Sequence, residues 1–267
     1  MEVFPSDYIH IGGDEARKKE WPLCPKCRAL MEREGIPDYD ELQCYMIDRI
    51  EDYLHSKGKI MCGWDEISKN GLYPESVVYS YRGQEYVSQA ANKGQKVIFT
   101  PGAALYFDWY QDTPQTQPRA MVGYSPIRKV YLTEPLADTP QKALFNEELI
   151  LGHKIDREIE WISSEEAAGN LLGVQGCAWS EYIDDCQQLE YMVFPRLLAV
   201  AELGWTPSHL RDWDSFKRRM NAHVVSLRSM GLNCYPLSDR IDISSVASSG
   251  SSLVSLECEK YPSEIRY

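Results

Sequence analysis

Short β-rich stretches alternate with helical stretches along most of this 267-residue chain. Glycine, proline or polar residues bound each β-rich stretch, and the segments between them are long enough to hold a helix. Strands and helices that alternate in this way form parallel sheets, because a parallel strand pair needs a crossover connection. The sequence therefore predicts an α/β fold with about five parallel strands and flanking helices. The expected strands are Tyr8–Ile11, Lys59–Cys62, Val77–Tyr81, Lys96–Thr100 and Leu171–Val174.

Aromatic and acidic residues lie just past all five strands. Taken singly, each is typical of a core ring or a solvated acid. The carboxyl ends of parallel strands, however, meet at one edge of the sheet, where α/β folds build their active sites. The shared position therefore favours a pocket lined by rings and carboxylates. Its members are Asp14 and Glu15; Trp64 and Asp65; Tyr81; Tyr106 and Asp108; Trp179 and Glu181.

The octet Tyr8–Glu15, with the sequence YIHIGGDE, shows this pattern most clearly. Gly12 and Gly13 end the strand and let the backbone pass close to a ligand. A second interpretation is a solvated turn in which Asp14 and Glu15 open the following helix, where acids favour the positive end of the helix dipole. The octet alone fits both interpretations, and the other four strand ends favour the site.

The helices are predicted from caps and apolar spacing. Asp38, with Glu41 three residues later, resembles a capping box, and Gly58 ends that helix. Its apolar stripe is Leu42, Met46, Ile50 and Leu54. Further helices are expected over Val87–Asn92, in Pro135–Ile162 as one or two helices, over Leu189–Leu203 with a kink at Pro195, and over Ser215–Met230. Within Pro135–Ile162 the expected buried positions are Leu149, Ile150, Ile155, Ile159 and Trp161. Residues Gln111–Arg128, rich in Pro, Gln and Thr, are expected to form a long loop.

Composition excludes several classes of partner. The chain is 43% hydrophobic, which is enough for a core, and its net charge of −12 argues against nucleic acid, since phosphates are bound by clustered Lys and Arg. No apolar run approaches the roughly 18–20 residues that span a bilayer, so no membrane partner is expected. Met1–Ser6 lacks the features of a signal peptide, and a cytoplasmic location is the expectation for this chain as it stands.

The eight cysteines are irregularly spaced, which is more typical of reduced thiols than of a disulfide framework. Cys24 and Cys27 are the exception, because they form a CxxC motif. That motif is typical of half a zinc site or of a redox pair, but no second CxxC or paired histidine completes four zinc ligands. A structural or incidental role is the favoured interpretation, and no metal or cofactor is predicted.

Several motifs along the chain together resemble those of a known family. HIGGDE, GWDE, YFD and GVQGCAWSEYI follow one another in the chain, and EYMVFPRLLAVAELGWTP and DWDSFKRRMNAHVVSLRSMGLNCYP come after them. This series resembles the barrel of glycoside hydrolase family 20, the β-N-acetylhexosaminidases. The resemblance implies a (β/α)8 barrel of TIM type in a single catalytic domain over residues 1–267. The barrel-like region covers residues 7–236, and a tail covers residues 237–267.

The resemblance also implies a reaction. Family members hydrolyse terminal β-linked N-acetylglucosamine or N-acetylgalactosamine with assistance from the substrate, whose 2-acetamido oxygen attacks the anomeric carbon. Glu15 would be the general acid and then the general base. Asp14 would bind the acetamido N–H and stabilise the oxazolinium-like intermediate, and Tyr106 would aim the acetamido oxygen. Trp64, Tyr81 and Trp179 would enclose the sugar, and Asp108 and Glu181 would accept hydrogen bonds from its hydroxyls.

The chain also departs from the family pattern. Its first strand corresponds to the family's fourth, so the first three βα units are absent, together with an Arg that grips sugar hydroxyls and a His that supports the general acid. Tyr81 stands where relatives have Trp. Two hypotheses follow: an active N-acetylhexosaminidase, which the retained acetamido-side residues favour, and a sugar-binding remnant without turnover.

Five strands do not close an eight-stranded barrel. The HIGGDE and GVQG strands are therefore expected to be the edges of the sheet, and bare edges promote aggregation. The tail offers one further β-rich stretch, Leu253–Leu256. A homodimer that packs the open sides together is the expected solution, because one self-complementary patch then covers both copies.

Overall fold

The computed structural model describes residues 3–248 and 251–263 of the chain. The chain forms two compact units, each built from two segments of the sequence. The first unit comprises residues 1–102 and 134–175, and the second comprises residues 103–133 and 176–267.

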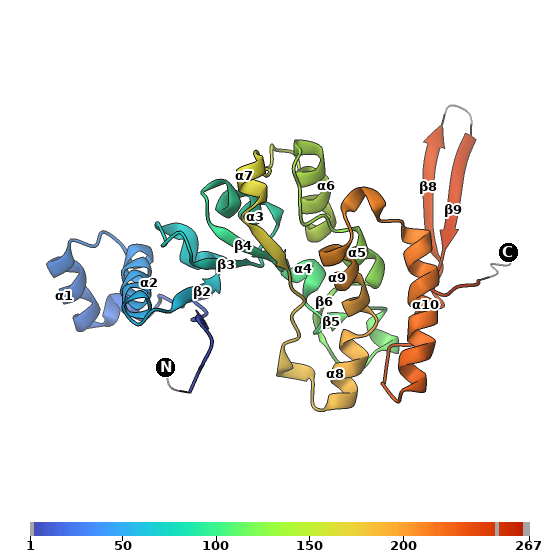
Figure 1. The fold of residues 1–267 in the computed structure, drawn as a ribbon, viewed down its shortest axis with the longest axis horizontal. Coiled ribbons are helices and arrows are strands. Elements are labelled where there is room, and N and C mark those ends of the chain that lie inside the picture. Colours follow the sequence, from blue (N-terminus) through green and yellow to red (C-terminus); the bar gives the residue numbers. More distant parts are fainter. Residues whose placement is uncertain (1–2, 249–250, 264–267) are drawn as a thin grey trace. The chain divides into compact units, whose positions relative to one another are not determined.

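The first unit contains a five-stranded parallel sheet in the order β1-β2-β3-β4-β7 (Figure 1). All neighbouring strands pair in parallel, which confirms the predicted partial barrel sheet of five strands. Within the described residues β1 and β7 are the two edge strands, as expected for the HIGGDE and GVQG segments. The strands are β1 (Tyr8–His10), β2 (Ile60–Trp64), β3 (Val77–Ser80), β4 (Lys96–Phe99) and β7 (Leu171–Val174).

Helices flank these strands in the first unit. They are α1 (Pro25–Glu34), α2 (Tyr39–Ser56), α3 (Gln84–Asn92), α6 (Pro140–Leu151) and α7 (Glu165–Ala168). The predicted start of α2 is confirmed, since the Asp38 carboxylate accepts a hydrogen bond from the Glu41 N–H at 2.8 Å. The apolar stripe is only partly buried. Leu42 and Leu54 are in the core, but Met46 is 49% exposed, and Ile47 is buried instead.

The prediction for Pro135–Ile162 was wrong in extent, because its C-terminal part is not helical. Gly152 takes a left-handed backbone with φ of 77° and ends α6. The extended segment that follows still buries Ile159, which packs with Ala137 and Ala143. Of the expected buried positions, Ile150 and Ile159 are buried, and Leu149, Ile155 and Trp161 are half-buried.

The second unit is mainly helical. Its helices are α4 (Gly102–Leu105, which starts at the boundary), α5 (Ile127–Leu132), α8 (Cys186–Val193), α9 (Arg196–Trp205) and α10 (Trp213–Ser229). The predicted kink at Pro195 is a full break between α8 and α9, because proline has no N–H to continue the helix. Arg196 is fully buried there and donates hydrogen bonds to the carbonyl oxygens of Phe107, Trp109, Ser125 and Met192.

The long loop predicted for Gln111–Arg128 was also wrong. It contains β6 (Met121–Tyr124), which pairs with β5 (Trp109–Tyr110), and it runs into α5. Gly123 permits this pairing, since a Cβ atom there would come within 2.2 Å of the Trp109 ring. Proline and glutamine content indicated a loop, whereas packing against Trp109 produces a strand.

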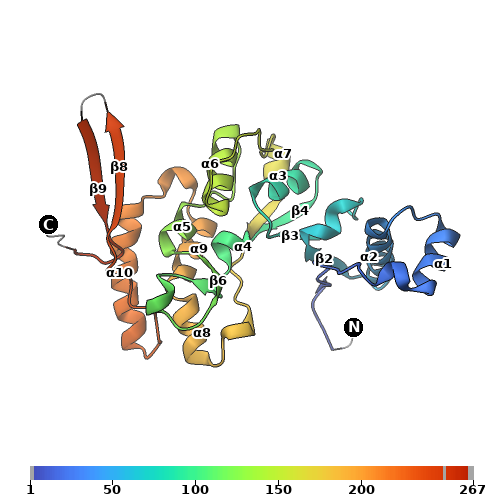
Figure 2. The ribbon, with the colours of Figure 1, turned by 180° about the vertical axis from the view of Figure 1, so that it is seen from behind.

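The tail forms an antiparallel hairpin of β8 (Asp242–Ser248) and β9 (Ser251–Glu257). The predicted strand over Leu253–Leu256 is therefore confirmed, but it belongs to this hairpin and not to the five-stranded sheet. Figure 2 shows the base of the hairpin beside α10. There the Asn221 side chain donates to the Glu259 carbonyl at 3.0 Å and accepts from the Tyr261 N–H at 2.9 Å.

Candidate active site

The loop after β1 is held in place through its two glycines. The Gly12 carbonyl accepts a hydrogen bond from the Trp64 N–H at 2.9 Å, and the Gly13 carbonyl accepts one from the Gln43 amide at 2.8 Å. Gly13 has φ of 94°, and a Cβ atom there would lie 2.5 Å from the Ile67 side chain. Glycine is therefore required by both conformation and space, and the loop is fixed against β2 and α2.

Asp14 and Glu15 follow this fixed loop. Asp14 is half-buried and Glu15 is exposed, and Glu15 takes a left-handed backbone with φ of 48°. A residue with a side chain seldom adopts that conformation, and such strain is concentrated at functional sites. The next helical turn begins only at Trp21, so the interpretation that these acids open a helix is wrong.

Trp64 and Tyr81 come together in an aromatic cluster at the strand ends. Their ring centroids are 5.8 Å apart, and the His10 ring lies 4.9 Å from both Trp64 and Tyr79. Burial lowers the pKa of His10, and the charge of Asp14 opposes that shift. Sequence reasoning did not place His10 or Tyr79 in this cluster. The signal was the register, because Tyr79 is the partner of Trp64 across the β2–β3 pair.

Asp65 organises the turn that carries Tyr81. Its buried carboxylate accepts hydrogen bonds from the Ser80 hydroxyl at 3.0 Å, from the N–H groups of Tyr81 and Arg82 at 3.2 Å each, and from Arg82 Nε at 2.7 Å. Burial raises the pKa of Asp65 to about 6, although Arg82 opposes the shift. The Tyr81 hydroxyl donates to Glu66 at 2.7 Å. Asp65 is therefore a positioning residue for Tyr81.

The other four candidate residues, Tyr106, Asp108, Trp179 and Glu181, belong to the second unit. Tyr106 forms a parallel bridge with Cys177, and its ring meets the Trp179 ring edge to face at 5.8 Å. Trp179 is 38% exposed, and Glu181 is exposed. The structure thus brings the rings of Tyr106 and Trp179 together.

Asp108 has an unusual carboxylate. It is buried, yet its Oδ1 atom has no hydrogen-bond partner among residues 3–248 and 251–263. Burial raises the pKa of Asp108, the charge of Glu181 adds to the rise, and the N–H groups of Asp108 and Trp179 and the charge of Arg196 oppose it. A buried carboxylate oxygen without a donor is costly, and a ligand hydroxyl would satisfy it.

Three features of the described residues concern disulfides, a metal site and a membrane-spanning helix. All eight cysteines lie in the described part of the chain and are free thiols. Across the described residues no three His, Cys, Asp or Glu side chains are grouped to hold a metal ion, so Cys24 and Cys27 have no third ligand there. Among the same residues no helix combines the length and apolar character needed to cross a bilayer.

The five parallel strands and their flanking helices are those of part of a (β/α)8 barrel. The chain belongs to glycosyl hydrolase family 20, because residues 1–208 match the model of that family's catalytic domain. It is 38% identical over 232 residues to a β-hexosaminidase of Porphyromonas gingivalis and 28% identical over 246 residues to the human β-hexosaminidase subunit beta. These matches cover 86% and 88% of this chain but 27% and 37% of the two relatives.

Solved structures agree with this assignment. The exo β-N-acetylglucosaminidase of Vibrio harveyi in complex with N-acetylglucosamine superimposes with a TM-score of 0.71 at 32% identity. That match covers 87% of this chain and 33% of the V. harveyi chain. This chain therefore spans about a third of the length of each of these relatives.

Proposed function

We propose that this chain carries the catalytic residues of a retaining hydrolase that removes terminal, non-reducing β-linked N-acetylglucosamine or N-acetylgalactosamine from glycans. Membership of family 20 supports this proposal, and so does the V. harveyi relative, whose structure holds N-acetylglucosamine. The rings are the residue type that packs against an N-acetylated sugar, and the acids are the type that stabilises positive charge developing on it during the reaction.

The proposed chemistry has two steps. In the first, the acetamido oxygen attacks the anomeric carbon while Glu15 gives a proton to the leaving oxygen, so the glycosidic bond breaks and an oxazolinium ion forms. The Asp14 carboxylate accepts the acetamido N–H and stabilises the new positive charge. In the second step, Glu15 takes a proton from water, which attacks the anomeric carbon from the side of the departed group. The bond between that carbon and the acetamido oxygen breaks, so the acetamido group is restored and the configuration is retained.

The remaining candidates bind the sugar in this proposal. Tyr106 donates its hydroxyl to the acetamido oxygen, and Trp64, Tyr81 and Trp179 pack against the acetamido group and the ring face. Asp108 and Glu181 accept hydrogen bonds from sugar hydroxyls. The unpartnered Oδ1 of Asp108 supports its role, because a sugar hydroxyl is the kind of donor that it lacks.

One observation carries the proposal: two adjacent acids follow a fixed Gly-Gly loop, and the second acid has a left-handed backbone. The test is Glu15→Gln in the full chain, assayed on aryl N-acetyl-β-glucosaminides. A poor leaving group needs its proton, so we expect a loss of about 100-fold or more, and a smaller loss with a good leaving group. Equal losses on both substrates would contradict a general-acid role.

Glu20→Gln is the matched control, because Glu20 is an exposed acid on the same segment and has no proposed role. Asp14→Asn should lower turnover of both substrates, since the acetamido charge must be stabilised whatever group departs. The alternative proposal is a sugar-binding remnant. It would be favoured if the unmodified chain bound N-acetylglucosamine and a thiazoline analogue of the intermediate within a few-fold of each other and hydrolysed neither substrate.

We also propose that a second copy of the chain covers the open edges. Within the described residues β1 pairs only with β2 and β7 only with β4, so each strand presents an unpaired edge. Unpaired edges are aggregation sites unless covered, and a two-fold dimer covers both with one patch. Light scattering at micromolar concentration should report a dimer, and a soluble monomer would contradict the proposal.

A further inference from the structure

Two thiols meet at the start of α1. Cys24 is the residue that caps the helix, with an extended backbone, and its carbonyl accepts the first helical hydrogen bond from the Arg28 N–H at 3.2 Å. Cys27 lies in the first turn of this ten-residue helix. Both cysteines are half-exposed free thiols. A small disulfide in solution can therefore reach them.

The spacing of the pair suits a disulfide. Side chains three residues apart on a helix have Cβ atoms about 5–6 Å apart, and a disulfide needs about 3.5–4.5 Å. Cys24 lies outside the helix proper, with φ of −82° and ψ of 114°, so its side chain can approach Cys27 without unwinding α1. Bond formation then requires only a local adjustment at the cap.

The two thiols differ electrostatically. The pKa of Cys24 is lowered, mainly by a hydrogen bond from the Cys27 N–H, then by the Cys27 thiol and the Lys26 N–H. The pKa of Cys27 is raised, because its thiol donates to Cys24. Cys24 lies outside the helix, where the backbone N–H of Cys27 stabilises its thiolate, so Cys24 is the attacking thiolate and Cys27 the resolving thiol. Burial instead raises the pKa of Cys44 and Cys234, and it raises the pKa of Cys62 to about 11.

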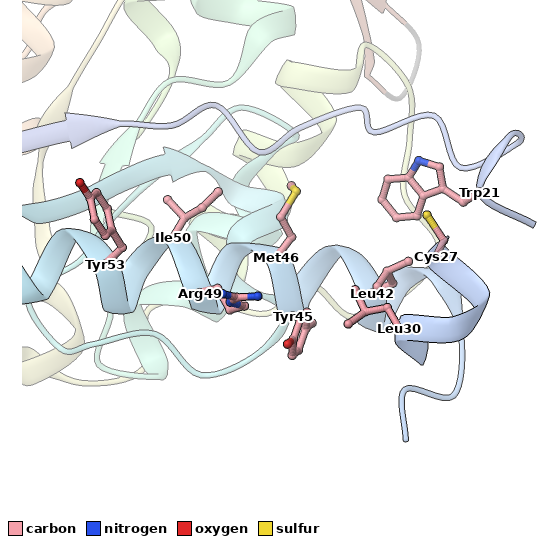
Figure 3. Close-up of a pocket in the computed structure, with 9 residues that line it drawn as sticks. All are labelled: Trp21, Cys27, Leu30, Leu42, Tyr45, Met46, Arg49, Ile50 and Tyr53. Carbon is pink, nitrogen blue, oxygen red and sulfur yellow. The ribbon is translucent and has the colours of Figure 1, made fainter. Parts of the chain in front are cut away.

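The pair adjoins an apolar pocket between α1 and α2. Cys27 lines this pocket of about 540 Å³, and Figure 3 shows its sulfur at the same end as the Trp21 ring. Trp21 is fixed there by the backbone, since its carbonyl accepts a hydrogen bond from the Cys24 N–H at 3.1 Å. The resolving thiol, Cys27, therefore lines the pocket together with Leu30, Leu42 and Met46.

We propose that Cys24 and Cys27 form a thiol–disulfide exchange site that closes reversibly into an intramolecular disulfide, with low-molecular-weight disulfides as the oxidant. The Cys24 thiolate attacks one sulfur of the small disulfide, which forms a mixed disulfide and releases one small thiol. The Cys27 thiol then loses its proton, attacks the Cys24 sulfur and expels the second small thiol. Two electrons pass to the small disulfide, and its two thiol products take up the two protons.

The experiment incubates the full chain with oxidised glutathione near neutral pH, followed by alkylation of remaining thiols and peptide mass spectrometry. We expect the peptide with both cysteines to lose two hydrogen atoms without retaining glutathione. Cys186 is the control thiol, because it is exposed and also begins a helix but has no neighbouring cysteine. It should retain glutathione as a mixed disulfide.

Two variants assign the roles of the two thiols. Cys27→Ser should leave glutathione trapped on Cys24, and Cys24→Ser should leave Cys27 reacting about tenfold more slowly than Cys24 does in the other variant. Glutathione retained on both cysteines of the unmodified chain would overturn the proposal, and so would exchange at Cys24 no faster than at Cys186. The readout does not involve glycan hydrolysis, so its failure is distinct from failure of the proposed enzymatic function.

Discussion

Asp65 in the first unit and Asp108 in the second are both buried aspartates near strand ends, but their carboxylates have different surroundings. The Asp65 carboxylate accepts four hydrogen bonds from Ser80, Tyr81 and Arg82, and Arg82 also supplies a charge. The Asp108 carboxylate has an Oδ1 atom without a partner in the described residues, and the charge of Arg196, which itself bonds to backbone carbonyls, stabilises its ionised form.

The difference separates two uses of a buried acid. A carboxylate whose two oxygens both accept hydrogen bonds from the protein holds the backbone around it, as Asp65 holds the Tyr81 turn. A carboxylate with a free oxygen has capacity left for a ligand. Burial and position after a strand are the same for both residues, so the hydrogen-bond partners are what distinguish a structural acid from a candidate binding acid.

The largest expected effect is on stability, from Asp65→Asn. One amide oxygen cannot accept all four hydrogen bonds, so donors on Ser80, Tyr81 or Arg82 lose their acceptor. Leaving a buried donor without an acceptor costs about 1–3 kcal/mol. The Arg82 side chain is 34% exposed, so water offsets part of the loss, and we expect about 2–3 kcal/mol from urea unfolding.

Asp7→Asn is the control for this variant, because Asp7 pairs with Lys59 at 3.4 Å on the surface, with 78% of its side chain exposed. That change should cost less than about 0.5 kcal/mol. If both variants lost similar amounts, the Asp65 network would have no special structural role and the comparison with Asp108 would fail.

The second prediction concerns sugar binding by Asp108. In Asp108→Asn the ligand hydroxyl loses a charged acceptor, which is worth about 1.5–3 kcal/mol, or roughly 10- to 100-fold in affinity. Calorimetry with a thiazoline analogue of N-acetylglucosamine measures the loss. The stability of the variant should change by less than about 1 kcal/mol, because no protein donor to Oδ1 is lost.

Asp112→Asn is the matched control in the same unit. Asp112 is also buried, but its carboxylate accepts from the Tyr235 hydroxyl at 3.0 Å and from the Thr113 N–H at 2.7 Å. It should affect stability and leave sugar affinity unchanged. Unchanged affinity in Asp108→Asn would remove Asp108 from the proposed binding set.

Local sequence rules predicted much of this fold. The five strands and the capped start of α2 follow from β-rich stretches bounded by turn residues and from Asp38 with Glu41. The rules failed where packing between distant residues overrides composition. β6 lies in a Pro- and Gln-rich stretch because Gly123 fits against Trp109, and the extended segment after α6 lies where apolar spacing indicated helix, since Gly152 ends that helix.

The site was predicted less completely. Position after a strand identified Trp64, Tyr81, Tyr106 and Trp179, and the structure brings each pair of rings together. The same rule does not separate Asp65 from Asp108, because hydrogen-bond partners come from residues that are distant in sequence or specific to the turn. His10 and Tyr79 were not predicted as members of the cluster, because strand register decides which side chains face it.

The third prediction concerns how the contribution of Asp65 to stability depends on pH. Burial raises the pKa of Asp65 from 3.8 to about 6, so the folded chain binds more protons than the unfolded chain between about pH 4 and pH 6. Stability from this group therefore falls as pH rises through that window, by on the order of 3 kcal/mol. Unfolding at several pH values should show this slope in the unmodified chain and a smaller slope in Asp65→Asn. A slope of opposite sign would mean that the Arg82 charge outweighs burial.

The smallest expected effect comes from Ser80→Ala, which removes one of the donors to the Asp65 carboxylate. Ser80 is fully buried, and its hydroxyl bonds to Asp65 at 3.0 Å, so the loss should be about 1 kcal/mol. The ionised carboxylate loses a stabilising donor, so the pKa of Asp65 should rise further and its pH window should move upward. Ser68→Ala is the control, because the Ser68 hydroxyl donates to the Asp65 backbone carbonyl at 2.7 Å and not to its carboxylate. It should cost a similar amount of stability and leave the pH window in place. If both serine variants moved the window equally, the carboxylate donors would not be what keeps Asp65 structural, and hydrogen-bond partners would not distinguish it from Asp108.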